Sequence, residues 1–136
     1  MTVVVDASVL VAALVDTGRE GQWAEELLAA SDLASPHLAP VETLNVLRRL
    51  EAAGTITPPQ AAEALDLFAA LDLELYPLAP VADRVWRLRG QLTSYDAWYV
   101  ALAESLQVPL ATLNRRLARA PNVACELSLP PFPSSR

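Results

Sequence analysis

The chain has 136 residues, of which 53% are hydrophobic and 19% charged, and these values predict one compact domain with its own core and exclude a disordered chain. Its formal net charge of −6 excludes nonspecific adhesion to nucleic acid over the whole surface, although a local basic rim is compatible with it. The basic residues are all arginines, and the lack of lysine excludes both a GxxxxGK phosphate-binding loop and Schiff-base chemistry.

The first predicted element is a buried parallel strand formed by the β-branched segment from Thr2 to Val5, which ends at an acid, Asp6. Ligands of open α/β sheets bind beyond the carboxyl ends of the strands, so Asp6 occupies a position that forms sites. We expect Ser8 to cap the following helix, over residues 9–14, and its hydroxyl to steady the Asp6 carboxylate. The alternative is that Asp6 is only a turn or cap residue.

Short strands and helices alternate through the rest of the chain, which predicts an α/β fold with a short parallel sheet and helices on both faces. In one helix we expect Trp86 to face inward. The domain is expected to take up residues 1–129, and the Pro- and Ser-rich tail at 130–136 to be loosely ordered. Strands are predicted over residues 32–35 (an edge strand at best), 73–76, 108–112 and 123–125, and helices over 22–30, 40–53, 57–71, 81–92, 96–106 and 114–119.

The helix that begins at Pro40 and ends before Gly54 carries a polar stripe. Glu42, Asn45 and Arg49 follow one another at spacings i, i+3 and i+7, and therefore share one face. Because apolar residues border this stripe, it favours the wall of a pocket over a solvated face. The alternative is an ordinary first-turn glutamate with an arginine partner.

Asp96 begins a helix that is hydrophobic on every side and is therefore predicted to be buried. A carboxylate in that position needs a partner, because burial of an unpaired charge costs free energy. The alternative is an acid that favours the first turn of a helix capped by Thr93 or Ser94.

Three acids thus lie at one strand end and at two helix starts, and these points can converge at one edge of the sheet: Asp6, Glu42 and Asp96. Carboxylates that converge repel one another unless a cation is bound. The chain has no Cys/His cluster, which argues against zinc, and an all-oxygen site favours Mg²⁺ or Mn²⁺. Such ions activate water and neutralise charge on a scissile phosphate, so the acids predict hydrolysis of phosphodiesters.

Four segments in order carry a family resemblance: Val-Val-Val-Asp-Ala-Ser at 3–8, Ala-Pro-Val-Glu-Thr-Leu-Asn-Val-Leu-Arg-Arg at 39–49, Tyr-Asp-Ala at 95–97 with Tyr-Val-Ala-Leu-Ala at 99–103, and Pro-Leu-Ala-Thr-Leu-Asn-Arg-Arg-Leu at 109–117. Through them nearly the whole chain resembles the PIN-domain ribonucleases, and within these the toxins of VapBC-type toxin–antitoxin pairs. Each segment alone is a weak signal, whereas the four at these spacings are specific. The resemblance implies a PIN-like three-layer α/β sandwich, metal-dependent endoribonuclease activity, a cognate VapB-type antitoxin and usually a homodimer.

By the family's pattern, Asp6, Glu42 and Asp96 match the metal-binding acids, and Thr112 lines the site. The departure is Asn114, at a position where most relatives carry an aspartate as a fourth acid. Asparagine keeps an oxygen ligand but loses a charge, so we expect Asn114 to hold a metal weakly. This departure weakens the expected catalysis and argues more strongly against a second metal.

The leading hypothesis is an endoribonuclease in which Mg²⁺ (or Mn²⁺) held by these acids activates water for attack on the phosphorus of a single-stranded or looped RNA. One alternative is a catalytically weakened binding module whose acidic pocket mainly receives a partner's basic side chain, and Asn114 favours it. Another is a plain oligomerising α/β protein whose acids are all caps. The candidates for holding RNA phosphates are Arg48, Arg49, Arg84, Arg87, Arg115, Arg116 and Arg119.

The single cysteine, Cys125, excludes an internal disulfide and indicates a reducing compartment, so the predicted location is the cytoplasm. No apolar run reaches the length of a membrane span, and no membrane partner is expected. The apolar residues near the N-terminus exceed what a monomer of this size needs to bury, and we expect them to meet the antitoxin in a hetero-oligomer: Leu14, Trp23, Leu27 and Leu28.

Overall fold

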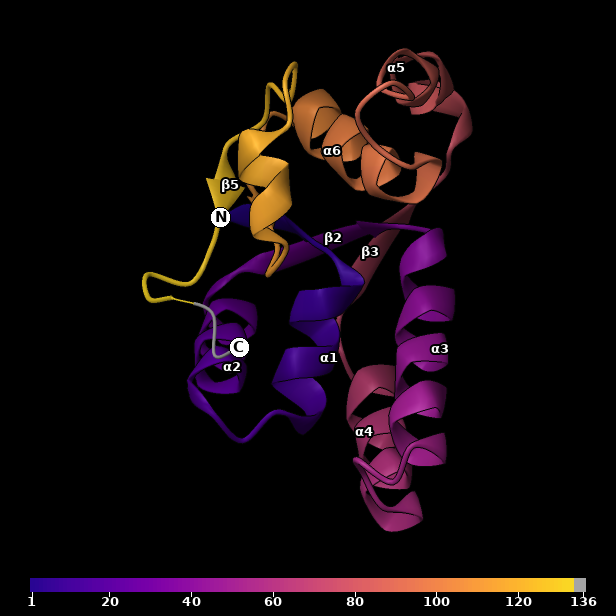
Figure 1. Cartoon of the computed structure of the whole chain (residues 1–136), viewed down its shortest axis with the longest axis vertical. Coiled ribbons are helices and arrows are strands. Elements are labelled where there is room, and N and C mark those ends of the chain that lie inside the picture. Colours follow the sequence, from indigo (N-terminus) through magenta and orange to yellow (C-terminus); the bar gives the residue numbers. More distant parts are fainter. Residues whose placement is uncertain (134–136) are drawn as a thin grey trace.

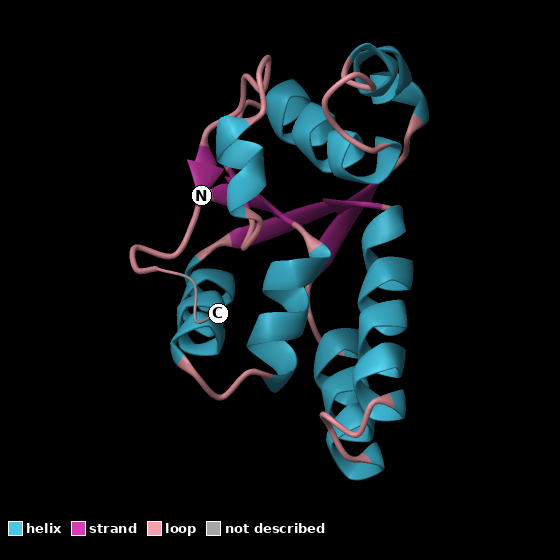
Figure 2. Ribbon diagram, in the orientation of Figure 1, coloured by secondary structure: helices cyan, strands magenta, loops and turns pink. Residues whose placement is uncertain are grey.

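A five-stranded parallel sheet forms the centre of the computed structural model, which describes residues 1–133 (Figures 1 and 2). The strand order across the sheet is β3-β2-β1-β4-β5, and every neighbouring pair runs parallel. The strands are β1 (Thr2–Val5), β2 (Asp32–Pro36), β3 (Leu73–Tyr76), β4 (Leu110–Ala111) and β5 (Leu127–Ser128).

Helices cover both faces of the sheet, as Figure 1 shows. One face carries α1 (Ala7–Val15), α2 (Arg19–Ala30), α3 (Leu38–Ala52) and α4 (Pro58–Ala69). The other carries α5 (Ala82–Arg87), which follows the 3₁₀ helix η1 (Ala79–Val81), then α6 (Ser94–Leu106) and the 3₁₀ helix η2 (Arg115–Arg119). This arrangement confirms the predicted α/β class and its three layers.

The core is built where β1 and α6 meet, because both elements are apolar on all sides. Val4, Val5 and Val100 are fully buried, and so is Leu110 of β4 beside them. A strand enclosed on both faces needs a continuous apolar run, which the segment before Asp6 supplies. In α6, residues 99–103 are all buried, which confirms the prediction of a helix hydrophobic on every side.

Local capping fixes two of the helix starts. Thr57 and Gln60 form a capping box at α4: the Thr57 hydroxyl accepts from the Gln60 N–H (3.2 Å), and the Gln60 side chain accepts from the Thr57 N–H (2.8 Å). At α6 the cap is Thr93, whose hydroxyl accepts from the Asp96 N–H (3.2 Å). Gly54 follows α3 with φ of 77°, a backbone conformation that favours glycine.

The starts of α1 and α2 differ from the prediction. Asp6 caps α1 instead of Ser8, because its carboxylate accepts from a backbone N–H of the first turn. The capping role in the alternative is therefore confirmed, but Asp6 is not only a cap, because its carboxylate also accepts from the Ser8 and Thr112 hydroxyls. The helix α2 begins at Arg19, earlier than predicted, and this turn of helix is possible because Gly21 lies against the backbone of Asp16. A Cβ on Gly21 would come within 1.8 Å of the Asp16 carbonyl oxygen.

Other boundaries were also wrong. The strand β2 lies between β1 and β3 and is therefore not an edge, and α3 begins at Leu38, before the predicted proline. The last strand is residues 127–128 instead of 123–125, because this is the segment that reaches the register of β4. The helix predicted over 81–92 ends at Arg87, and Trp86 is 64% exposed and stacks under Arg89 instead of facing inward.

The described part of the tail is anchored, contrary to the prediction of loose order. Pro130 is buried, and the Arg115 side chain donates to the backbone oxygens of Pro130 and Phe132. The Phe132 ring lies under the guanidinium of Arg19 at 4.2 Å. Residues 134–136 lie outside the described residues. Within residues 1–133, none of the helices has the length and apolar character needed to cross a membrane.

Candidate active site

The Asp6 carboxylate is the centre of a polar network at the carboxyl edge of the sheet. Its strand, β1, has β2 on one side and β4 on the other, so the chain departs from β1 in both directions, which is where open α/β sheets bind ligands. The Ser8 hydroxyl donates to Asp6 Oδ1 and the Thr112 hydroxyl to Oδ2, each at 2.5 Å. The Leu113 N–H donates to Ser8 Oγ (3.1 Å) and the Asn114 N–H to Thr112 Oγ1 (3.0 Å). These bonds join α1 to the end of β4 and fix the direction of the carboxylate.

Burial raises the pKa of Asp6, and the negative charge of Asp96 raises it further. Hydrogen bonds from Ser8, Thr112 and the Val9 N–H act in the opposite direction without offsetting the burial. No ion pair within residues 1–133 involves Asp6. The structure therefore holds a well-oriented carboxylate whose ionised form gains from a nearby cation.

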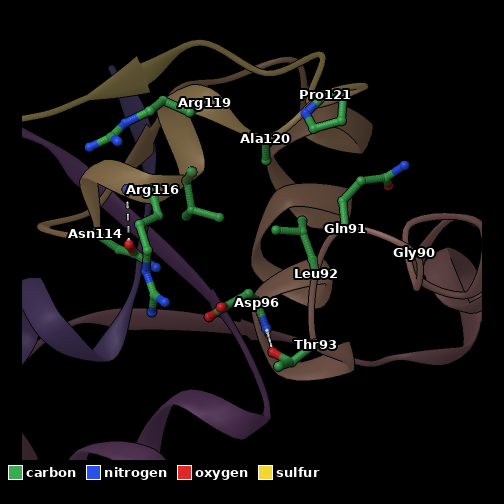
Figure 3. Close-up of a pocket in the computed structure, with 11 residues that line it drawn as sticks. Gly90, Gln91, Leu92, Thr93, Asp96, Asn114, Arg116, Arg119, Ala120 and Pro121 are labelled. Atoms are coloured by element: carbon green, nitrogen blue, oxygen red, sulfur yellow. Dashed lines mark hydrogen bonds between the residues drawn. The ribbon is translucent and has the colours of Figure 1, made fainter.

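Asp96 lies in the first turn of α6, within electrostatic reach of Asp6. Burial also raises the pKa of Asp96, while the positive charge of Arg116 and the hydrogen bond with Thr93 lower it. In Figure 3 the Asp96 carboxylate points toward the Arg116 guanidinium across the mouth of a cavity. Two of the three predicted acids thus lie within electrostatic reach of each other, and the pKa of each is raised mainly by burial.

The third acid, Glu42 on α3, is tied to this site by Tyr99, a residue that the sequence analysis did not single out. The Tyr99 hydroxyl donates to Glu42 Oε1 at 2.6 Å, and the residue is only 3% exposed. Burial, the Glu42 bond and charge, and the charge of Asp6 all raise the pKa of Tyr99, while a backbone hydrogen bond with Ala7 lowers it. Tyr99 is thus a neutral donor between two acids. The available signal was a tyrosine hydroxyl inside an apolar helix, which needs a partner when buried.

The donor set of this site fits a hard divalent cation, because it consists of carboxylate and amide oxygens around a buried carboxylate that repels its neighbour. The three acids are nevertheless not drawn into one cluster: within residues 1–133 no group of three or more Asp, Glu, His or Cys side chains is arranged to hold a metal ion. Asp6 and Asp96 interact electrostatically, and Glu42 is joined to them through Tyr99. Convergence of all three on one ion stays a prediction.

Asn114 has a structural role in addition to the predicted place at the site. Its side-chain oxygen accepts from the Arg116 N–H at 3.1 Å and caps η2. The residue also lines the same cavity as Asp96, as Figure 3 shows. An aspartate in its place would put a further negative charge beside that acid.

The predicted arginines have different surroundings: two of them line this cavity, and others donate hydrogen bonds to residues outside it. Arg116 and Arg119 line the cavity together with Asp96. Arg115 holds the tail, as described above. On α3, Arg48 donates to the Asn45 side-chain oxygen through Nε and Nη2, both at 3.1 Å, so Asn45 pairs with Arg48 on an exposed surface. The side chains of Arg49 and Arg87 are exposed.

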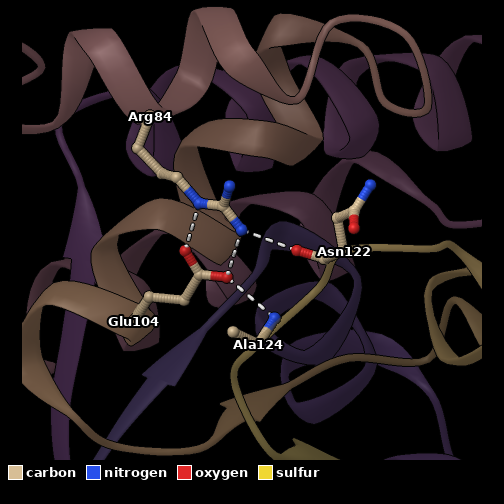
Figure 4. A network of polar contacts seen from close by, with 4 residues as sticks. All are labelled: Arg84, Glu104, Asn122 and Ala124. Carbon is tan, nitrogen blue, oxygen red and sulfur yellow. Dashed lines mark hydrogen bonds and ion pairs between the residues drawn. The ribbon is translucent and has the colours of Figure 1, made fainter.

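Arg84 forms a structural network away from the cavity (Figure 4). Its Nε and Nη2 donate to the two carboxylate oxygens of Glu104 at 2.7 and 3.1 Å, and Nη2 also donates to the Asn122 carbonyl oxygen at 2.6 Å. Glu104 in turn accepts from the Ala124 N–H at 2.8 Å. Glu104 is eight residues beyond Asp96 in α6, roughly 12 Å along the helix. The Arg84 guanidinium therefore ties α5 and α6 to the segment before β5.

Known proteins resemble this chain over nearly its whole length. The PIN domain model matches residues 3–123. A curated relative, Ribonuclease VapC1 of Mycobacterium tuberculosis, is 42% identical over 127 residues, which cover 93% of this chain and 96% of that protein.

Solved structures share the fold. The VapBC2 structure from Rickettsia felis, bound to a DNA fragment from its promoter, matches with a TM-score of 0.68 at 18% identity and covers 95% of this chain and 98% of that one. A toxin–antitoxin complex from Klebsiella pneumoniae matches with a TM-score of 0.67 at 18% identity, over 94% of this chain and 97% of that one. Together with the family model and the 42% identical relative, the sheet and its acidic edge lead to one assignment. The chain belongs to the PIN domain family.

Proposed function

We propose that this chain is an endoribonuclease that hydrolyses RNA with the help of Mg²⁺ or Mn²⁺, and that it is the toxin of a toxin–antitoxin pair. The observation that carries the proposal is the oriented, buried Asp6 carboxylate beside Asp96, at the sheet edge where such folds bind ligands. The ribonuclease name of the 42% identical relative supports the reaction.

Each residue has a role that follows from its contacts. Asp6 and Asp96 would hold the divalent ion, whose charge would relieve their mutual repulsion, and Glu42, which is joined to them through Tyr99, and the Asn114 oxygen would add further oxygen ligands. Ser8 and Thr112 orient Asp6, and Tyr99 orients Glu42. When bound, the ion supplies activation of water and neutralisation of phosphate charge.

The arginines that best suit RNA phosphates are those that lie at the site. Arg116 and Arg119 line the cavity beside Asp96, whereas Arg48, Arg49 and Arg87 are exposed on α3 and α5 and are not part of its lining. Arg84 and Arg115 are committed to intramolecular bonds, so they contribute to RNA binding through the structure that they hold.

An antitoxin partner of the VapB type is part of the proposal. Leu14 and Leu28 line an open groove of about 350 Å³ between α1, α2 and α4, together with Leu67, which is 50% exposed. All four of the predicted apolar residues are partly buried against the core, and the groove is where Leu14 and Leu28 are also open to a partner. A basic residue of that partner could occupy the position between Asp6 and Asp96 and so inhibit. The homodimer expected from the family resemblance is a proposal of the same kind.

The proposal is tested by incubating the purified chain with a generic single-stranded RNA in EDTA, Mg²⁺ or Mn²⁺, with Asp6→Asn as the matched variant. We expect internal cleavage only with a divalent ion, and a loss of at least about 100-fold in Asp6→Asn. Glu104→Gln, which alters an acid distant from the site, is the control and should retain the rate per folded molecule. Cleavage in EDTA, or unchanged cleavage by Asp6→Asn, would contradict the proposal. A folded wild-type chain that binds the ion without cleaving RNA would favour the binding-module alternative.

A further inference from the structure

A cavity of about 550 Å³ lies beside Asp96 (Figure 3). One wall is the connection between α5 and α6, residues 90–93, together with Asp96 itself. The other wall is η2 and its flanking residues, within 114–121. The volume falls in the range of about 300–1,000 Å³ that is usual for small-molecule sites.

The two walls are apolar where they face each other and charged at one end. Leu92 and Ala120 project toward the space between the walls in Figure 3, and Leu117 lines the same space. At the end nearest the candidate active site, the Asp96 carboxylate and the Arg116 guanidinium point toward each other. The site therefore offers apolar contact and charge within one enclosure.

A nucleotide matches this lining better than either simpler ligand. The faces of a base suit the aliphatic walls, its polar edges can pair with the exposed Gln91 amide at the rim, and its phosphate suits the Arg116 guanidinium at the charged end. A small anion alone would leave Leu92 and Leu117 without contact. A purely apolar ligand would cover the charged Asp96 and Arg116 side chains without offering them a hydrogen-bond partner, which costs free energy.

We infer that this cavity binds one unpaired nucleotide of the RNA, next to the phosphodiester that is cut at Asp6 and Asp96, and thereby selects the cleavage site. The inference rests on the proposed ribonuclease function. A base in a duplex is paired and stacked, so the nucleotide that enters must come from a single strand or a loop. No aromatic side chain is among the described residues that line the cavity, so selection depends on its shape and on Gln91 more than on aromatic stacking.

The test uses a substitution that fills the cavity with a larger side chain, at a position whose backbone conformation accepts one. Ala120→Phe places a ring between the two walls, whereas Ala118→Phe adds the same ring on the exposed side of η2 and is the matched control. Gln91→Ala is a second variant at an exposed position, which removes the edge contact without touching the core. Thermal melts establish that each variant is folded.

Binding is measured without catalysis, by methyl NMR titration with the four nucleoside 5′-monophosphates. We expect at least one of them to shift the Leu92 and Leu117 methyl signals in the wild type and in Ala118→Phe, but not in Ala120→Phe. Gln91→Ala should retain binding and change the order of preference among the four. If none of the four moves these methyl signals at millimolar concentration, the inference is overturned.

Cleavage-site mapping on a mixed-sequence RNA is the second readout. Ala120→Phe should cut the preferred sites about ten-fold more slowly, which corresponds to a loss of about 1.4 kcal/mol of contact with the nucleotide, and its preferences should flatten. A cleavage pattern identical to that of the wild type would overturn the role in selection while leaving the ribonuclease function intact. Nucleotide binding in a wild type that cleaves no RNA would support the cavity assignment and contradict the ribonuclease function.

Discussion

Replacing Tyr99 by phenylalanine removes one hydroxyl from the candidate site and leaves the aromatic ring in place. That hydroxyl donates to Glu42 Oε1 at 2.6 Å from a side chain that is 3% exposed. Hydrogen bonds to charged groups contribute about 1.5–3 kcal/mol, and the partial exposure of Glu42 lets water replace part of the lost bond. We therefore expect Tyr99→Phe to lower the free energy of unfolding by about 1–2 kcal/mol, or Tm by roughly 3–10 °C.

The assay is a double-mutant cycle with Glu42→Gln, read by chemical denaturation in EDTA. If the hydroxyl acts through Glu42, Tyr99→Phe should cost about 1 kcal/mol less in the Glu42→Gln background than in the wild type. Cleavage by Tyr99→Phe should also require more Mn²⁺, because Glu42 is no longer held in place. An equal cost in both backgrounds, with an unchanged Mn²⁺ requirement, would show that Tyr99 serves packing alone and would refute the positioning role.

Three further outcomes are expected. The pKa of Asp96 in the folded chain is raised above the ordinary 3.8, so the folded chain binds a proton at Asp96 more tightly than the unfolded chain does, and the stability of the metal-free chain falls as the pH rises from 3.8 through the raised pKa. Asp96→Asn should remove the contribution of Asp96 to this pH dependence and should melt at a higher temperature than the wild type at pH 7. A lower melting temperature of the variant in EDTA would count against this reasoning. Asn114→Asp should tighten Mn²⁺ binding by roughly ten-fold in calorimetric titration, whereas equal affinities would make Asn114 only the cap of η2. Arg84→Met should lower stability by roughly 1–2 kcal/mol, less than for a fully buried pair because 35% of the Arg84 side chain is exposed, and a variant as stable as the wild type in denaturant would contradict the assigned network.

The elements with strong local signals could be predicted from the sequence. The run from Thr2 to Val5 can only be a buried strand, and the apolar helix after Asp96 can only be a core helix. The placement of β2 beside β1 could not be predicted, because its short segment carries no signal for its neighbours. The end of α5 at Arg87 and the strand at 127–128 likewise depend on tertiary pairing and not on local propensity.

The acids of the site could be predicted from the sequence, whereas the residues that orient or surround these acids were harder to predict. Asp6 was identifiable because a charge directly after a buried strand is unusual, and Thr112 only through the family resemblance. The link from Glu42 to Tyr99 joins residues 57 positions apart, and no helical or strand period connects them. The arginines were the weakest part, since the sequence does not distinguish Arg84, which is bound to Glu104, from Arg116, which lines the cavity.

The central claim is that Asp6 and Asp96 form a divalent-metal site, and crystals of the wild-type chain grown with Mn²⁺ test it most directly. Anomalous difference density identifies Mn²⁺ without reference to activity. We predict a peak between the two carboxylates, with at least one oxygen of each at about 2.0–2.6 Å or joined through an ordered water, and loss of the peak in Asp6→Asn. Ordered Asp6 and Asp96 side chains at saturating Mn²⁺, with no anomalous peak between them, would contradict the claim.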